Sequence, residues 1–159
     1  MAEYNRSDLL AAGKIPGLPI FSWDRGGFLG RARQCYLDIE AGTLGGIVVE
    51  ESNFRRRKAY INVDKILKIY RDGIIVKDKN AIVWGKNLPQ GQIPLSDFLN
   101  RADLVYGEGE VISDLFFDAN FKIVGGEISG GFWQDISTGR GFCPWRKLSE
   151  KTKLQENGR

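Results

Sequence analysis

Two stretches of the chain carry the same pattern: CYLDIEAGTLGG at residues 35–46 and LFFDANFKIVGG at residues 115–126. In each stretch an apolar run ends in an aspartate, Asp38 or Asp118, and six residues separate that aspartate from a pair of glycines. The two pairs are Gly45-Gly46 and Gly125-Gly126. Glycine inside a strand pattern is typical of a bulge or a tight bend. We therefore predict that one bent sheet unit occurs twice in this chain.

The similarity continues on both sides of these stretches. Residues 60–66 match residues 142–148 once two residues of loop are added. Before each copy stands a Ser-Asp pair followed by apolar residues, at positions 7–10 and 96–99. Each serine can cap a helix, so we expect a short helical turn at each lead-in.

The spacing of apolar runs and turn residues predicts an all-β fold, because the runs are short and recur about every ten residues. The predicted strands of the first copy cover residues 18–23, 28–39, 44–50, 59–63, 66–70, 74–76 and 81–84. We divide the chain into a first domain at 1–84, a connector at 85–95, a second and diverged domain at 96–148, and a polar tail at 149–159.

Composition excludes most catalytic chemistry. Histidine is absent, which removes His-based triads, metal sites and pH switches. The two cysteines, Cys35 and Cys143, fall on the inward alternation of their predicted strands and are expected to fill the core. Asp38 and Asp118 are expected to bond turn backbone rather than act as acid and base. We expect no enzyme activity, no cofactor and no metal site.

Charge and hydropathy point to a cytoplasmic protein. The chain has 23 basic and 20 acidic residues, a net charge of +3. This excess is too small to argue for nucleic acid from bulk electrostatics alone. No apolar run reaches the roughly 20 residues needed to cross a bilayer. We therefore expect no membrane span, and with few cysteines and no export signal we expect a reducing, cytoplasmic location.

Three segments resemble the PRC-barrel family: GRARQCYLD at 30–38, GGIVVE at 45–50 and RRRKAYINVDKI at 55–66. Positions 107–148 resemble a second, more diverged copy. The resemblance implies two tandem small β-barrels, the second abbreviated, that serve as binding platforms. In this family the barrel occurs in the cytoplasmic H subunit of photosynthetic reaction centres and in a ribosome-maturation factor.

Two loops are the candidate binding sites, and the same position in each copy carries a different chemistry. The densest charge cluster is Arg55, Arg56, Arg57 and Lys58, which follows Phe54. Arginines and neighbouring rings suit phosphates and bases, although a basic hairpin tip is often only solvated. The second copy carries Phe132 and Trp133 instead, and exposed tryptophan is typical of protein interfaces.

From these features we expect a non-catalytic binding or assembly module that engages an unidentified protein partner through the loops at 52–58 and 130–140. One alternative is an RNA- or ribosome-associated maturation factor that holds phosphates with residues Arg55 to Lys58. A further alternative, by analogy with the reaction-centre H subunit, is a cytoplasmic component of a membrane electron-transfer complex. The sequence leaves the oligomeric state open, with a homodimer as one alternative.

Overall fold

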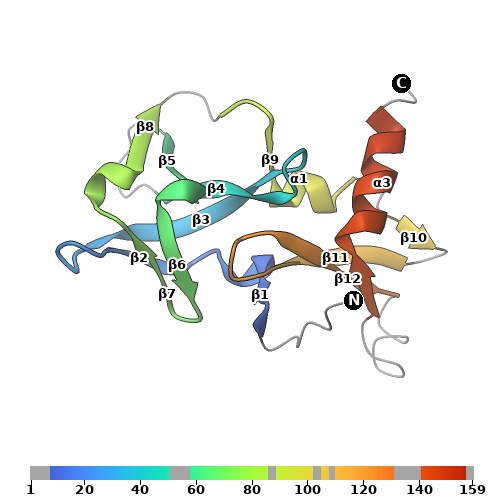
Figure 1. The fold of residues 1–159 in the computed structure, drawn as a ribbon, viewed down its shortest axis with the longest axis horizontal. Helices are drawn as coiled ribbons and strands as arrows, with labels where there is room; N and C mark the ends of the chain where they lie inside the picture. The colour runs from blue at the N-terminus through green and yellow to red at the C-terminus, as the bar shows by residue number, and fades with distance from the viewer. Residues whose placement is uncertain are drawn as a thin grey trace. The chain divides into compact units, whose positions relative to one another are not determined.

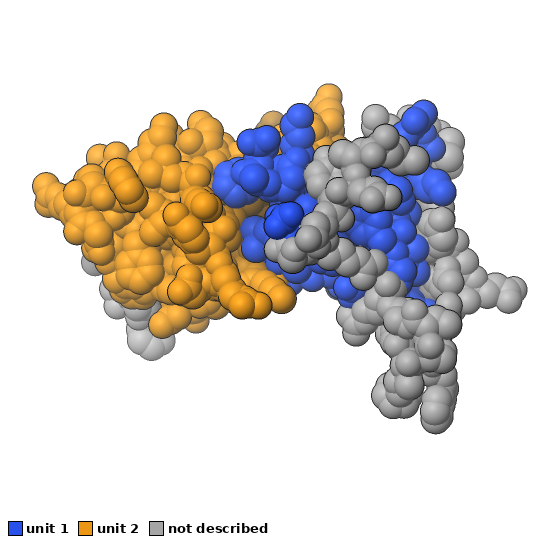
Figure 2. Space-filling model, turned by 60° about the horizontal axis from the view of Figure 1, so that its bottom comes forward, with its two compact units in different colours: residues 1–13, 96–159 blue, residues 14–95 orange. Residues whose placement is uncertain are grey.

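The structure is a computed structural model that describes residues 8–50, 58–85, 89–101, 105–107, 110–130 and 141–156. The fold is mostly β, as predicted. The chain divides into two compact units: unit 2 is Lys14–Leu95, and unit 1 combines Met1–Gly13 with Ser96–Arg159 (Figure 2). Unit 1 is therefore discontinuous in sequence, which the predicted boundaries did not include.

Unit 2 is built on an eight-stranded sheet with the order β6-β7-β2-β3-β4-β5-β8, and β9 pairs with β3 (Figure 1). Its strands are β2 (Pro19–Ser22), β3 (Phe28–Asp38), β4 (Thr43–Val49), β5 (Lys58–Asn62), β6 (Ile66–Tyr70), β7 (Gly73–Val76), β8 (Ile82–Gly85) and β9 (Gln92–Pro94). Short 3-10 turns, η3 (Val63–Lys65) and η4 (Lys79–Ala81), precede β6 and β8. Fully buried aliphatic side chains such as Ile20, Leu37 and Ile47 form the core.

Unit 1 has a five-stranded sheet with the order β1-β11-β12-β13, and β10 pairs with β11. Its elements are β1 (Leu10–Ala11), β10 (Val105–Gly107), β11 (Glu110–Phe117), β12 (Ile123–Ser129), β13 (Gly141–Pro144) and the helix α3 (Trp145–Glu156). The 3-10 turn η2 (Ala12–Lys14) follows β1, and the helix α1 (Leu95–Leu99) precedes β10. Phe98 of α1 is fully buried, with its ring centroid 5.9 Å from that of Trp145.

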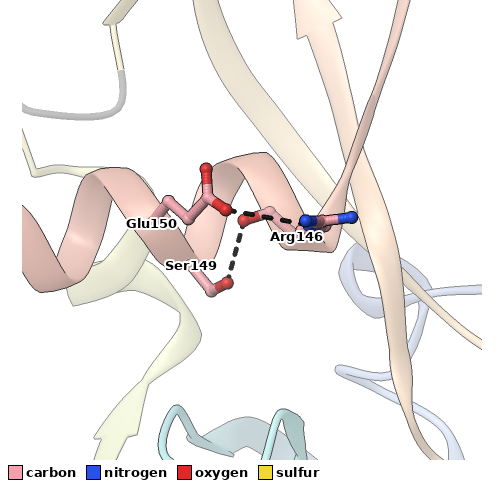
Figure 3. Close-up of polar contacts among 3 residues, drawn as sticks. All are labelled: Arg146, Ser149 and Glu150. Carbon is pink, nitrogen blue, oxygen red and sulfur yellow. Dashed lines mark hydrogen bonds and ion pairs between the residues drawn. The ribbon is translucent and has the colours of Figure 1, made fainter.

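The exposed side of α3 carries ordinary helix-surface contacts (Figure 3). Arg146 lies 3.7 Å from the carboxylate of Glu150, one turn along, and the Ser149 hydroxyl donates to the Arg146 carbonyl at 3.0 Å. An exposed ion pair of this kind adds only a few tenths of a kcal/mol, about 0.3–0.5. The buried side chain of Leu148 therefore matters more for holding α3 on unit 1.

Two like-connected series of strands underlie the sequence similarity: β2 to β5 in unit 2 and β10 to β13 in unit 1. Tyr36 of β3 lies opposite Gly46, and Phe116 of β11 lies opposite Gly125. Tyr36 and Phe116 are equivalent residues, as the match between the two sequence stretches predicts. Gly46, however, corresponds to Gly125 and not to Gly126, because the second hairpin is one residue shorter.

Both hairpin loops end on a left-handed residue despite this difference in length. The N–H of Gly42 donates to the Asp38 carbonyl at 2.9 Å, and the N–H of Phe121 donates to the Asp118 carbonyl at 3.0 Å. Gly42 has a φ of 69° and Phe121 a φ of 63°. Glycine accepts this left-handed conformation freely, whereas a phenylalanine is strained there by about 1–2 kcal/mol.

The lead-in strands are exchanged between the two series. β1, which precedes the first series, pairs with β11 of the second, placing Leu10 opposite Phe117. β9, which precedes the second series, pairs with β3 of the first, placing Ile93 opposite Leu37. Leu37 and Phe117 are equivalent positions. Each series therefore pairs, at the same place, with the short strand that precedes the other series in sequence.

Three predicted segments differ from the structure. The segment 85–95, predicted to be a connector, contains β9, and the segment 149–159, predicted to be a polar tail, contains most of α3. Ser96 lies inside α1 rather than at its cap, so the helix begins two residues earlier than expected. Ser7 lies outside the described residues.

Candidate functional site

The residues nominated from the sequence as binding sites fall mostly where the structure describes nothing. Phe54, Arg55, Arg56, Arg57, Phe132 and Trp133 lie outside the described residues. Lys58 is the first residue of β5, with its Cα opposite Gly85 of β8.

The two cysteine thiols lie in the core. Cys35 and Cys143 are both buried, as predicted, opposite Ile47 and Gly126. Within the ranges that the structure describes, no three Cys, Asp or Glu side chains group together as metal ligands.

The two aspartates of the repeated pattern bond turn backbone, as predicted. Asp38 Oδ1 accepts the Ala41 N–H at 3.0 Å. Asp118 Oδ1 accepts the N–H groups of Asn120 and Lys122 at 2.9 and 3.0 Å. Each carboxylate is engaged in its own hairpin loop.

The paired glycines allow close packing between neighbouring strands. The ring of Tyr60 lies directly over Gly46, and the ring of Phe142 lies directly over the equivalent Gly125. The Tyr60 hydroxyl donates to Gln92 Oε1 on β9. Burial raises the pKa of Tyr60 to about 12. The phenol therefore stays protonated, and it serves to join β5 to β9 through the side chains.

A different arrangement exists on the sheet formed by β6, β7, β2 and the start of β3 (Figure 1). Along β2 and β7, side chains alternate between two faces. One face is the core, with Ile20, Ser22, Ile74 and Val76 all buried. The opposite face is directed away from that core. In an antiparallel sheet with one solvated face we expect polar residues there.

Aromatic and apolar side chains occupy that second face instead. Phe28, Phe21, Ile75 and Lys68 stand opposite one another in a row across the four strands. Phe28 is 59% exposed, and its ring meets that of Phe21 edge-on, with centroids 5.9 Å apart. We call the face defined by Pro19, Phe21, Phe28, Arg31, Lys68, Tyr70 and Ile75 the aromatic face.

A second row runs beside the first. Arg31 stands opposite Pro19 at the β3 side, and Tyr70 stands opposite Gly73 at the β6 side. Tyr70 is 45% exposed. Gly73 leaves room for the ring of Phe21, whose nearest atom would lie 3.5 Å from a Cβ at that position.

Each exposed ring of the aromatic face has a cation beside it. The Arg31 guanidinium carbon lies 5.9 Å from the Phe28 centroid, and Lys68 Nζ lies 4.7 Å from the Tyr70 centroid. Arg31 also donates to the Gly17 carbonyl at 3.0 Å. The strand segments 19–22, 28–31, 66–70 and 73–76 contain no Asp or Glu. The face is thus apolar at its centre and cationic at two opposite corners.

The most exposed large apolar side chain among the described residues adjoins this face. Trp23 directly follows β2, and its side chain is 74% exposed. Its backbone N–H donates to the Val76 carbonyl at 2.8 Å, which continues the β2–β7 ladder by one residue. An exposed indole anchored by its backbone is typical of binding surfaces.

The sequence reading missed the aromatic face, because the direction of Phe28 depends on a bulge in β3. The register shifts between the pairs Ile20–Gly30 and Phe21–Phe28, so Leu29 is an extra residue. The sequence did hold one signal: Ile20 and Phe21 are adjacent apolar residues in β2. Successive side chains of a strand point to opposite faces, so one of the two must lie on the outer face.

No family model and no curated protein matches the chain. Among the helices in the described residues, none combines the length and apolar character needed to pass through a bilayer.

Proposed function

We propose that the chain is a non-catalytic protein-binding and assembly module, built from two copies of a PRC-type β-barrel, the second abbreviated. We propose further that the aromatic face of unit 2 is a surface through which it engages a protein partner. The observation that carries this proposal is the pair of exposed rings, Phe28 and Tyr70, on a sheet face directed away from the core.

The composition of the face supports an interface. Contiguous exposed apolar surface is uncommon on soluble monomers and marks sites of interaction. Tryptophan, tyrosine and arginine are the residue types enriched among energetically dominant interface positions. Trp23, Tyr70 and Arg31 supply one of each at or beside the aromatic face. Scattered single apolar residues on a surface would carry no such argument.

The positions of the family-like segments support the PRC-type assignment. Residues 30–38 lie in β3, 45–50 run along β4, and the described part of 55–66 forms β5, η3 and the first residue of β6. The same strand order and lead-in pairing recur in unit 1. A duplicated sheet unit is well suited to act as a platform.

Site-specific photo-crosslinking in the native cell tests this function. Benzoylphenylalanine is placed at Phe28 or Tyr70, and at Lys79 of η4 as an exposed control. We expect one protein to be captured from positions 28 and 70 but not from position 79. The captured protein, once purified, should bind the full chain, and Phe28→Ser should weaken that affinity tenfold or more, as expected for a central ring. Crosslinks equal to those from position 79 would refute the proposal.

RNA binding is a second candidate function, favoured by the cation beside each ring. Arginine or lysine next to exposed aromatic rings is the arrangement with which proteins hold stacked bases and phosphates of single strands. Such binding loses affinity steeply with salt, with a log–log slope of about 0.7 for each phosphate contact. A titration with single-stranded RNA at several salt concentrations separates it from binding centred on the rings, which salt affects little.

A further inference from the structure

We infer that the partner segment received by the aromatic face is acidic: an apolar stretch flanked by two carboxylates, one for Arg31 and one for Lys68. This inference rests on the proposed function, since it names the chemistry of the partner at the same surface. It follows from how charge is placed on the face and from the spacing between the two cations.

The charged side chains on the strands of the face are both cations. Arg31 and Lys68 are both exposed, and the four strand segments that build the face hold no carboxylate. The nearby acidic residues stand at the rim: Asp24 and Asp72 lie in the turns that follow β2 and β6, and Glu50 follows β4, where its N–H donates to the Arg31 carbonyl at 2.8 Å. A partner with carboxylates above the strands is attracted, whereas a cationic partner meets two like charges.

Arg31 is held in position before any partner arrives. Its bond to the Gly17 carbonyl uses one of five guanidinium N–H donors, and its plane rests near the Phe28 ring. A side chain fixed in this way loses less conformational entropy when it pairs with a carboxylate. The planar fork can also meet a carboxylate with two parallel bonds, which a lysine cannot.

The two cations occupy opposite corners of the face. Arg31 lies on β3 and Lys68 on β6, with β2 and β7 between them, and the two belong to neighbouring rows. Strands about 4.8 Å apart and rows two residues apart place their Cα atoms roughly 16 Å from each other. A helical partner segment covers that span with about 11 residues. Its apolar residues then lie over Phe21 and Ile75.

The same features argue against RNA as the occupant of this face. Two cations offer about two phosphate contacts, which is a small electrostatic contribution to nucleic-acid affinity. Most of the face is apolar side chain, including Pro19 and Ile75, which match no part of a nucleotide as well as they match aliphatic groups. An acidic, apolar protein segment uses both the centre and the corners.

Fluorescence anisotropy with three labelled probes tests the inference on the full chain. The probes are a helical peptide of about 14 residues with leucines at its centre and glutamates near both ends, the same peptide with lysines for glutamates, and a single-stranded oligouridylate. The protein variants are Arg31→Glu and Lys68→Glu. Lys79→Glu is the matched control, because it makes the same charge change on an exposed residue outside the face. Thermal melts check that each variant is folded.

We expect the acidic peptide to bind, the lysine peptide to bind at least tenfold more weakly, and each of Arg31→Glu and Lys68→Glu to weaken the acidic peptide about tenfold. Lys79→Glu should leave the affinity within twofold. Equal affinity for the two peptides, tighter binding of the oligouridylate, or equal losses in all three variants would overturn the inference. If the partner captured at position 28 binds Arg31→Glu and Lys68→Glu normally, the proposed function stands and the acidic occupant is wrong.

Discussion

Replacing Gly46 with alanine should damage unit 2 severely, because two groups already fill the space a methyl group needs. A Cβ on Gly46 would come closer than 3.0 Å to both the Tyr60 hydroxyl and the Ile61 carbonyl oxygen. The carbonyl belongs to the backbone of β5, so it cannot move away alone. Either the strands separate or the Tyr60 ring lifts.

The cost follows from the contacts that such a movement breaks. Overpacking of this kind costs about 1–3 kcal/mol. Lifting the ring loses the Tyr60–Gln92 hydrogen bond, about 1 kcal/mol, and the edge-on contact with Tyr36, about 0.5–1.5 kcal/mol. We expect Gly46→Ala to lower the free energy of unfolding by about 3–5 kcal/mol. For a chain of this size that lowers the Tm by roughly 10 °C.

Urea unfolding followed by circular dichroism measures the loss, and Gly27→Ala is the matched control. A Cβ at Gly27 meets only Ser22 Oγ, at 3.8 Å, so alanine there should change stability by less than about 1 kcal/mol. Gly125→Ala should behave like Gly46→Ala, because its Cβ meets the Cys143 carbonyl and the Phe142 ring. A loss below about 1 kcal/mol for Gly46→Ala would refute the argument from close packing.

Other measurements test the hairpin, the buried phenol and the exchanged strands. Phe121→Gly should stabilise unit 1 by about 0.5–1 kcal/mol in urea unfolding, since it relieves a left-handed phenylalanine; no gain means the ring compensates for the strain. The raised pKa of Tyr60 stabilises the fold below pH 10, and that contribution is lost as pH rises to about 12. Tyr60→Phe should flatten this part of the pH profile. Deleting residues 1–13 removes β1 and should lower the unfolding temperature of unit 1 while sparing unit 2; equal losses in both units would contradict it.

The sequence predicts the central strands well, because their side-chain alternation survives in both copies. Tyr60 and Phe142 occupy equivalent places in β5 and β13, as their spacing indicated. The glycine pairs differ in register by one residue, because register depends on hairpin length and the second hairpin is one residue shorter. In that shorter loop, Phe121 takes the left-handed conformation that Gly42 takes in the first. Backbone conformation of that kind leaves no mark in hydrophobic periodicity.

The exchanged lead-in strands were beyond sequence reasoning for a different cause. β1 has two residues and β9 has three, too few to carry a period of two. Their partners are also far away in the chain, so local turn chemistry says nothing about the pairing. The direction of Phe28 was likewise set by one extra residue at Leu29, which pairing alone reveals.

The exchange of edge strands has a consequence for biosynthesis. Leu10 leaves the ribosome long before Phe117, its partner across the ladder, has been translated. At about 5–20 residues per second, the first strand waits roughly 5–20 s for the segment it joins. The stretch Lys14–Leu95 is continuous and can be completed during that interval. The nascent chain therefore finishes its middle first and its two ends together, and the earliest segment made is among the last to find its place.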